Sequence, residues 1–149
     1  MSMNEWNIGV DIVDVARFRQ LDYFSGKRFH ERVFTSREIE HCLSFRDPAP
    51  HFAANFAAKE AVYKAVNRFY DVKLNEIEVL RDKAGAPYVN LRLNHKEVAK
   101  CKSSEMNLPF EIKVSLSHSA LYAVAFAVVI YPRRAMRKFK LCIENGVLT

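Results

Sequence analysis

Residues 51–69 constrain the fold of this chain more than any other segment. They contain no Gly or Pro, are rich in alanine, and place Phe52, Phe56, Tyr63 and Val66 at helical spacing. This pattern predicts a long helix. Half of the 149 residues are hydrophobic and only four are glycine, so the chain can build the core of one domain and is not of the disordered class.

Shorter segments on both sides of this helix are typical of strands and of brief helices. The predicted strands are 6–13, 76–81, 88–93, 111–117 and 121–131, and a turn at 82–87 joins the second and third into a hairpin. Asp14 is predicted to cap a short helix that ends at Phe24. Thr35, with Glu38 completing a capping box, is predicted to begin another that ends at about 47–50. Two further short helices are predicted at 27–33 and 95–102. Without strict strand–helix alternation, the fold class is α+β.

The net charge of +6 is concentrated in two segments. Residues 132–149 carry five basic residues and one acid, and space Met136, Phe139 and Ile143 along one helical face. We therefore divide the chain into a domain at 1–131 and a basic helical extension at 132–149. A second basic segment covers 14–37. Such segments suit an acidic protein, a polyphosphate ligand or nucleic acid, and charge does not choose among them.

Targeting signals are not apparent. The start of the chain has no basic region before its apolar residues, and the longest uncharged apolar run, 120–131, is too short for a membrane-spanning helix. Cys42, Cys101 and Cys142 have no metal-binding spacing, which favours reduced thiols and a cytoplasmic location.

Two acidic residues lie in apolar surroundings on different predicted elements. Asp11 is inside a strand rich in Val and Ile, and Glu60 is on the long helix between Phe56 and Tyr63. The two carboxylates could meet at one Mg²⁺, which takes one or two protein carboxylates and leaves other positions to water and substrate phosphates. The alternative is a structural ion pair for each, such as Glu60 with Lys64 one turn later.

Other side chains are candidates for anion binding or proton transfer. Lys59 and Lys64 flank Glu60 and could stabilise a pyrophosphate, although helical lysines are usually solvated. His118, at the end of a predicted strand, could orient a group or relay a proton, or could belong to an ordinary turn. The chain has no GxSxG elbow, no P-loop and no dinucleotide-binding glycine pattern.

Four stretches, in this order and at this spacing, resemble the holo-acyl-carrier-protein synthase type of 4'-phosphopantetheinyl transferase. They are 8–17 (IGVDIVDVAR), 55–65 (NFAAKEAVYKA), 76–88 with its AGAPY turn, and 114–118 (VSLSH). Each motif is weak alone, but together they are specific and span about residues 7–131. The resemblance implies a fold in which an antiparallel sheet wraps around the long central helix.

The resemblance also implies a role for each matching residue. Asp11 and Glu60 match magnesium ligands, Lys59 and Lys64 fall where coenzyme A phosphates are held, and His118 matches a histidine near the pyrophosphate. Glu60, Lys64 and His118 would be the catalytic set. Arg17, Lys27 and Arg28 fall where an acidic carrier protein is gripped. The family forms homotrimers with active sites between subunits, and neither membrane nor nucleic acid is an expected partner.

The chain departs from the family pattern at several positions. Asn55 stands where an arginine usually precedes the FAxKEA motif, residues 67–71 replace a glycine-rich turn, and Ser119 follows the motif histidine. The tail after Pro132 extends past the usual end of the family. These differences indicate a divergent member.

The implied reaction is attack of a carrier serine on the pantetheine-bearing phosphorus of coenzyme A, with release of adenosine 3',5'-bisphosphate, as in fatty acid biosynthesis. Glu60, a metal-bound water and His118 are each candidates for the base. Two other hypotheses are a catalytically inactive scaffold that binds the carrier and a nucleic-acid-binding protein. The second lacks a recognised binding motif and leaves Asp11 and Glu60 unexplained.

Overall fold

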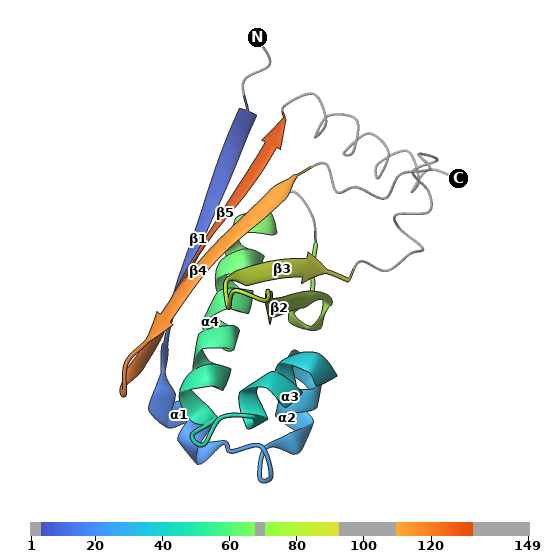
Figure 1. Cartoon of the computed structure of the whole chain (residues 1–149). Helices are drawn as coiled ribbons and strands as arrows, with labels where there is room; N and C mark the ends of the chain where they lie inside the picture. Colours follow the sequence, from blue (N-terminus) through green and yellow to red (C-terminus); the bar gives the residue numbers. More distant parts are fainter. Residues whose placement is uncertain (1–3, 68–70, 93–109, 133–149) are drawn as a thin grey trace, which may run out of the picture.

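A computed structural model describes residues 4–67, 71–92 and 110–132 (Figure 1). The elements, in chain order, are β1 (Asn4–Asp14), α1 (Val15–Gln20), α2 (Lys27–Val33), α3 (Ser36–Leu43), α4 (Ala49–Val66), the 3₁₀ turn η1 (Leu74–Glu76), β2 (Ile77–Arg81), β3 (Pro87–Leu91), β4 (Glu111–His118) and β5 (Tyr122–Pro132). Strands and helices are mixed, with antiparallel sheets around the long helix α4, so the predicted α+β class is confirmed.

The main sheet has three antiparallel strands in the order β1–β5–β4. Val10 pairs with Phe126, and Ser115 pairs with the same residue from the other side. Alternate residues of β5 point inward and are buried, including Ala123, Ala125 and Ala127. These small side chains let the helix approach the sheet closely.

Helix α4 lies against the inner face of this sheet and is covered on almost all sides (Figure 1). Fourteen of its eighteen residues are buried, among them an alanine series in which Ala57, Ala58, Ala61 and Ala65 have no exposed surface. A helix that is apolar all round must be internal. The helix begins two residues before the predicted start, with Pro50 in its first turn, where a missing N–H is tolerated.

The closest approach between helix and sheet is at Gly9 of β1. A Cβ atom built there would lie 1.9 Å from the carbonyl oxygen of Ala61. Asn7 adds a side-chain hydrogen bond from Nδ2 to the carbonyl oxygen of Ala65, at 2.9 Å. Only glycine leaves room for this backbone-to-backbone contact, so β1 and α4 are held in one register.

The remaining described elements cover the opposite side of α4. The hairpin β2–β3 pairs Ile77 with Leu91 and turns at Gly85, whose φ of 83° is one that glycine adopts readily. Helices α1, α2 and α3 gather at the end where α4 begins (Figure 1). Aromatic rings of Phe18, Phe34 and Phe52 fill the space between them.

Two helices end earlier than the sequence predicts. The Asp14 cap is confirmed, but α1 stops at Gln20 rather than Phe24 because Asp22 accepts hydrogen bonds from the N–H groups of Phe24 and Ser25 and closes a local turn. The capping box of Thr35 and Glu38 is also confirmed, yet α3 ends at Leu43, before the proline-containing segment.

Several predictions fall at the edge of the described residues or beyond it. Pro132 is the last residue of β5, where it pairs with Asn4, so it does not begin the predicted tail helix. The rest of that extension, at 133–149, and the predicted helix at 95–102 lie outside the described residues.

The outer face of the main sheet is exposed and apolar. Trp6, Ile8, Val10 and Ile12 of β1 point to this side together with Tyr122, Val124 and Phe126 of β5. The outer positions of the third strand, β4, are polar, with Lys113, Ser115 and Ser117. A contiguous apolar surface of this kind usually marks an association site. Among the described helices, none is both long and apolar enough to cross a membrane.

Candidate active site

The fold brings Asp11 and Glu60 together between β1 and α4. Asp11 points inward two residues after Gly9, and Glu60 precedes Ala61, the residue whose carbonyl Gly9 meets. Burial raises the pKa of Glu60, and the nearby Asp11 carboxylate raises it further by repulsion. The two predicted metal ligands therefore interact electrostatically, although 48 residues separate them along the chain.

Two cations accompany the acidic pair. The Lys64 ammonium donates to Asp11 Oδ1 at 2.7 Å and to the Val10 carbonyl oxygen at 2.9 Å. The Arg17 guanidinium lies 5.1 Å from the ring centre of Phe56, one turn before Glu60. Both cations act to lower the pKa of Glu60. Of the structural ion pairs considered as the alternative, the structure shows one for Asp11, and its partner is Lys64, which had been suggested for Glu60.

Lys59 does not join this group. Its side chain has no exposed surface, and its ammonium donates to both carboxylate oxygens of Glu38, at 2.9 and 2.6 Å, and to the Ile77 carbonyl oxygen. Burial lowers the pKa of Lys59, while the Glu38 carboxylate opposes that shift. This position corrects the expectation that Lys59 contacts phosphates, because the ammonium faces α3 and β2 and is inaccessible.

His118 lies near the start of α4, away from the acidic pair. Its ring packs edge-on against His51 with centres 5.1 Å apart, and His51 stacks on Phe45 at 3.5 Å. His51 precedes Glu60 by nine residues, which is about 13 Å along the helix axis. Burial lowers the pKa of His51, and the neighbouring His118 and His41 lower it further. Within one chain, His118 therefore lies apart from Glu60 and Lys64, the other two residues of the predicted catalytic set.

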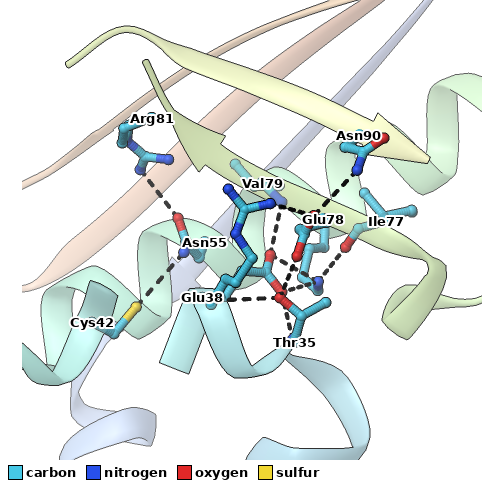
Figure 2. Close-up of polar contacts among 11 residues, drawn as sticks. Thr35, Glu38, Cys42, Asn55, Ile77, Glu78, Val79, Arg81 and Asn90 are labelled. Atoms are coloured by element: carbon cyan, nitrogen blue, oxygen red, sulfur yellow. Dashed lines mark hydrogen bonds and ion pairs between the residues drawn. The ribbon is translucent and has the colours of Figure 1, made fainter. Parts of the chain in front are cut away.

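The residue that departs from the family pattern, Asn55, is buried near this histidine group. Its Oδ1 accepts a hydrogen bond from Arg81 Nη2 at 3.1 Å, and its Nδ2 donates to the Cys42 sulfur at 3.6 Å (Figure 2). Arg81 also lowers the pKa of His41 and of His51. A guanidinium therefore does contact position 55, but it comes from β2. Burial raises the pKa of the Cys42 thiol to about 12, which keeps it protonated.

The predicted carrier-binding residues are on the surface of α1 and α2. Arg17, Lys27 and Arg28 are all exposed, and Lys27 forms a weak pair with Glu31 one turn later, at 3.7 Å. Arg17 differs from the other two because it also faces the acidic pair. It joins the basic surface to the candidate metal site.

Sequence reasoning missed Arg81, His51 and Glu38. Arg81 and His51 carry no local signal, because their relation to Asn55 and His118 exists only in the folded chain. Glu38 was identified as a helix-capping residue, and its capping role gave no reason to connect it with Lys59.

The raised pKa of Glu60 predicts a pH-dependent effect on stability. A carboxyl whose pKa is raised by folding contributes stability in acid and loses it as the pH rises through the folded pKa. Without metal, Glu60→Gln should therefore stabilise the fold at neutral pH and not in acid. The gain should be less than about 1 kcal/mol because the group is partly solvated. Thermal unfolding from pH 4 to 8 measures it, and lower stability of the variant at neutral pH would contradict it.

Comparison with known proteins connects this geometry to a family. Residues 7–127 match the 4'-phosphopantetheinyl transferase superfamily. The chain is 43% identical over 124 residues to the holo-acyl-carrier-protein synthase of Chlorobaculum parvum, with 82% of this chain and 96% of that protein covered.

Solved structures agree with the sequence match. The ACPS–CoA complex of Chronobacterium ammoniagenes has a TM-score of 0.68 at 29% identity, covering 87% of this chain and 99% of that one. The Helicobacter pylori synthase in complex with coenzyme A has a TM-score of 0.63 at 28% identity, covering 82% and 98%. With this fold, these motifs in order and a match over residues 7–127, the chain belongs to the 4'-phosphopantetheinyl transferase superfamily.

Proposed function

We propose that this chain transfers the 4'-phosphopantetheine group of coenzyme A to a serine of an apo acyl carrier protein. The observation that carries the proposal is the convergence of Asp11 and Glu60 beside Lys64 and Arg17, within a fold shared with coenzyme A-binding synthases. The named relatives are holo-acyl-carrier-protein synthases. The location would be the cytoplasm and the pathway fatty acid biosynthesis.

The acidic pair fits a magnesium ion. Two carboxylates on β1 and α4 repel one another in a partly buried place, and hard oxygen ligands of this kind suit Mg²⁺. Asp11 and Glu60 would hold the ion. When bound, it would supply charge neutralisation at the coenzyme A pyrophosphate. Lys64, already at Asp11, would add a positive charge beside the same phosphates.

The reaction balances without a further reactant. The serine oxygen forms a bond to the phosphorus that carries pantetheine, and the bond from that phosphorus to the bridging oxygen breaks. The leaving group is adenosine 3',5'-bisphosphate, and the serine proton passes to a base. Within the chain, Glu60 and His118 are the residues proposed for that role.

A second group of polar side chains, which includes the guanidinium of Arg81, supports a place for the nucleotide. Arg81 and three histidines, His41, His51 and His118, lie near one another where α4 begins. Arg81 could offer the phosphates the guanidinium that the family carries at position 55. Because this group is remote from Glu60 in one chain, we propose that a neighbouring subunit brings the two parts of the site together in a homotrimer.

One experiment tests the proposal against its alternatives. The protein is incubated with magnesium, coenzyme A and an apo carrier, and the carrier is weighed by mass spectrometry. A mass gain equal to phosphopantetheine supports transfer. Carrier binding without the mass gain would favour an inactive scaffold, and binding to nucleic acid in place of the carrier would favour the third hypothesis.

Removal of either acid should abolish transfer. Asp11→Ala and Glu60→Ala each leave one carboxylate, which is too weak a site for the metal, so we expect at least a 100-fold loss of turnover, roughly the effect of losing one major electrostatic contact. Glu76→Ala, a change in the 3₁₀ turn, is the control. Near-normal magnesium-dependent turnover in either acid variant, with folding preserved, would refute the ligand assignment.

Charge reversal on α1 and α2 should weaken carrier binding selectively. Arg28→Glu removes attraction to an acidic carrier and should raise the KM for carrier by about tenfold, with a smaller effect on that for coenzyme A. Added salt should mimic the defect. Arg17→Glu should likewise raise the KM for carrier more than the KM for coenzyme A. It should also lower kcat, because Arg17 faces Glu60. A raised KM for coenzyme A alone would reverse the assignment.

The apolar outer face of the sheet should mediate the proposed assembly. Ile12→Glu places a charge on this face opposite Val124 of β5, and should give single chains that no longer transfer, since burying an unpaired carboxylate is costly. Leu43→Glu, an exposed apolar position on α3, is the matched control and should keep the wild-type mass. Sedimentation measures both. Trimers of Ile12→Glu, or single chains of the wild type, would exclude this interface.

A further inference from the structure

The fold contains a buried ionic group that the proposed reaction does not use. Lys59 and Glu38 have no exposed surface, and Glu78 is almost fully buried beside them. Figure 2 shows Glu38 of α3 and Thr35, the N-cap of the same helix, facing Ile77, Glu78 and Val79 of β2.

Glu38 connects three elements at this point. Its carboxylate accepts from the Lys59 ammonium on α4, from the Val79 N–H on β2 at 2.8 Å, and from the Thr35 N–H at 2.8 Å. The Thr35 hydroxyl in turn donates to Glu78 at 2.8 Å. Such directional contacts set positions that apolar packing does not.

On the sheet side, the contact between Gly9 and Ala61 sets how closely α4 approaches β1. Seven of the fourteen buried residues of α4 are alanine, whose side chains of one carbon interdigitate weakly with a neighbouring element. On the side of the helix that faces α3 and β2, directional contacts include the hydrogen bonds of Lys59. A buried ion pair is also a poor source of stability, because well-packed apolar residues are often as good or better. The pair between Lys59 and Glu38 is therefore better explained by a role in positioning α4 than by a contribution to the stability of the fold.

Lys59 and Glu60 are consecutive, so their side chains point about 100° apart around the helix axis. Fixing the direction of Lys59 fixes that of Glu60. Side chains extend about 5–6 Å from the axis, so a helix rotation of about 10° would move the end of Glu60 by about 1 Å. A displacement of this size can cost about 100-fold in rate.

We propose that Glu38 and Lys59 are positioning residues, whose buried ion pair sets the rotation of α4 that brings Glu60 to Asp11. The inference rests on the proposed function, in which those two acids hold the metal. Neither positioning residue touches substrate or metal, and each acts through the helix.

The test uses a neutral double variant, Glu38→Gln with Lys59→Met, in the full-length chain. The glutamine oxygen still accepts one backbone N–H and methionine preserves volume, so no unpaired charge is buried. Affinity for Mn²⁺, used as a spectroscopic probe of the acidic pair, is measured by electron paramagnetic resonance alongside thermal unfolding. We expect about tenfold weaker Mn²⁺ binding, a similar rise in the magnesium needed for half-maximal transfer, and an unchanged KM for carrier.

Arg37→Ala is the matched control. Arg37 is an exposed residue 3.6 Å from Glu78, so its loss disturbs the edge of the network and leaves the central pair intact. It should bind Mn²⁺ as the wild type does. If the double variant does not fold, Glu38→Asp, which keeps the charge and shortens the side chain, should show a smaller loss in the same direction.

The outcomes separate this inference from the proposed function. Wild-type Mn²⁺ affinity in a folded double variant, or in Glu38→Asp where only that variant folds, would overturn the positioning role even if transfer occurs. If the wild-type protein performs no transfer, but the double variant binds Mn²⁺ more weakly than the wild type does, the positioning role is supported and the proposed function is refuted. Equal losses in Arg37→Ala and the double variant would also overturn the inference, because they would show a general effect of disturbing this region.

Discussion

The contact between Gly9 and Ala61 is the constraint on which the rest of the structure depends. Two backbones meet there without intervening side chains, which places β1 directly on the central helix. Asp11 follows two residues later, and Lys64 reaches back to the carbonyl of Val10. The same close approach thus determines how the sheet covers α4 and where the acidic pair forms.

The two charged groups on α4 differ in how they balance burial. Lys59 and Glu38 neutralise each other in a fully buried place, and backbone groups complete their hydrogen bonds. Asp11 and Glu60 instead repel one another in a partly buried place, and Lys64 and Arg17 act against that repulsion. The first arrangement is what a structural ion pair requires. The second is typical of functional sites, where burial and a neighbouring like charge often raise the pKa of a carboxyl as they do for Glu60.

Most elements were predictable because their signals are local. The long helix, the hairpin turn at Gly85 and the capping box of Thr35 and Glu38 depend on residues within a few positions of each other. The early end of α1 was missed because the Asp22 side chain competes with the helix for backbone N–H groups.

The candidate site was only partly predictable, for a physical reason. Apolar surroundings identified Asp11 and Glu60 from sequence alone, since an acid there needs a partner. The direction of Lys59 was not predictable, because helical spacing gives the angle between Lys59 and Glu60 but not which of them faces the core. Arg81 contacts Asn55 from another element, and no spacing rule links such positions.

The alanine surface of α4 has a consequence for how such an enzyme can change. Ala57, Ala58 and Ala61 have no exposed surface, so a larger side chain at any of them would push the sheet or the hairpin away. Two of the residues proposed for chemistry, Glu60 and Lys64, therefore lie on an element that tolerates little variation. New carrier preferences would have to arise at the loops and the exposed faces of α1 and α2, where substitutions leave the core undisturbed.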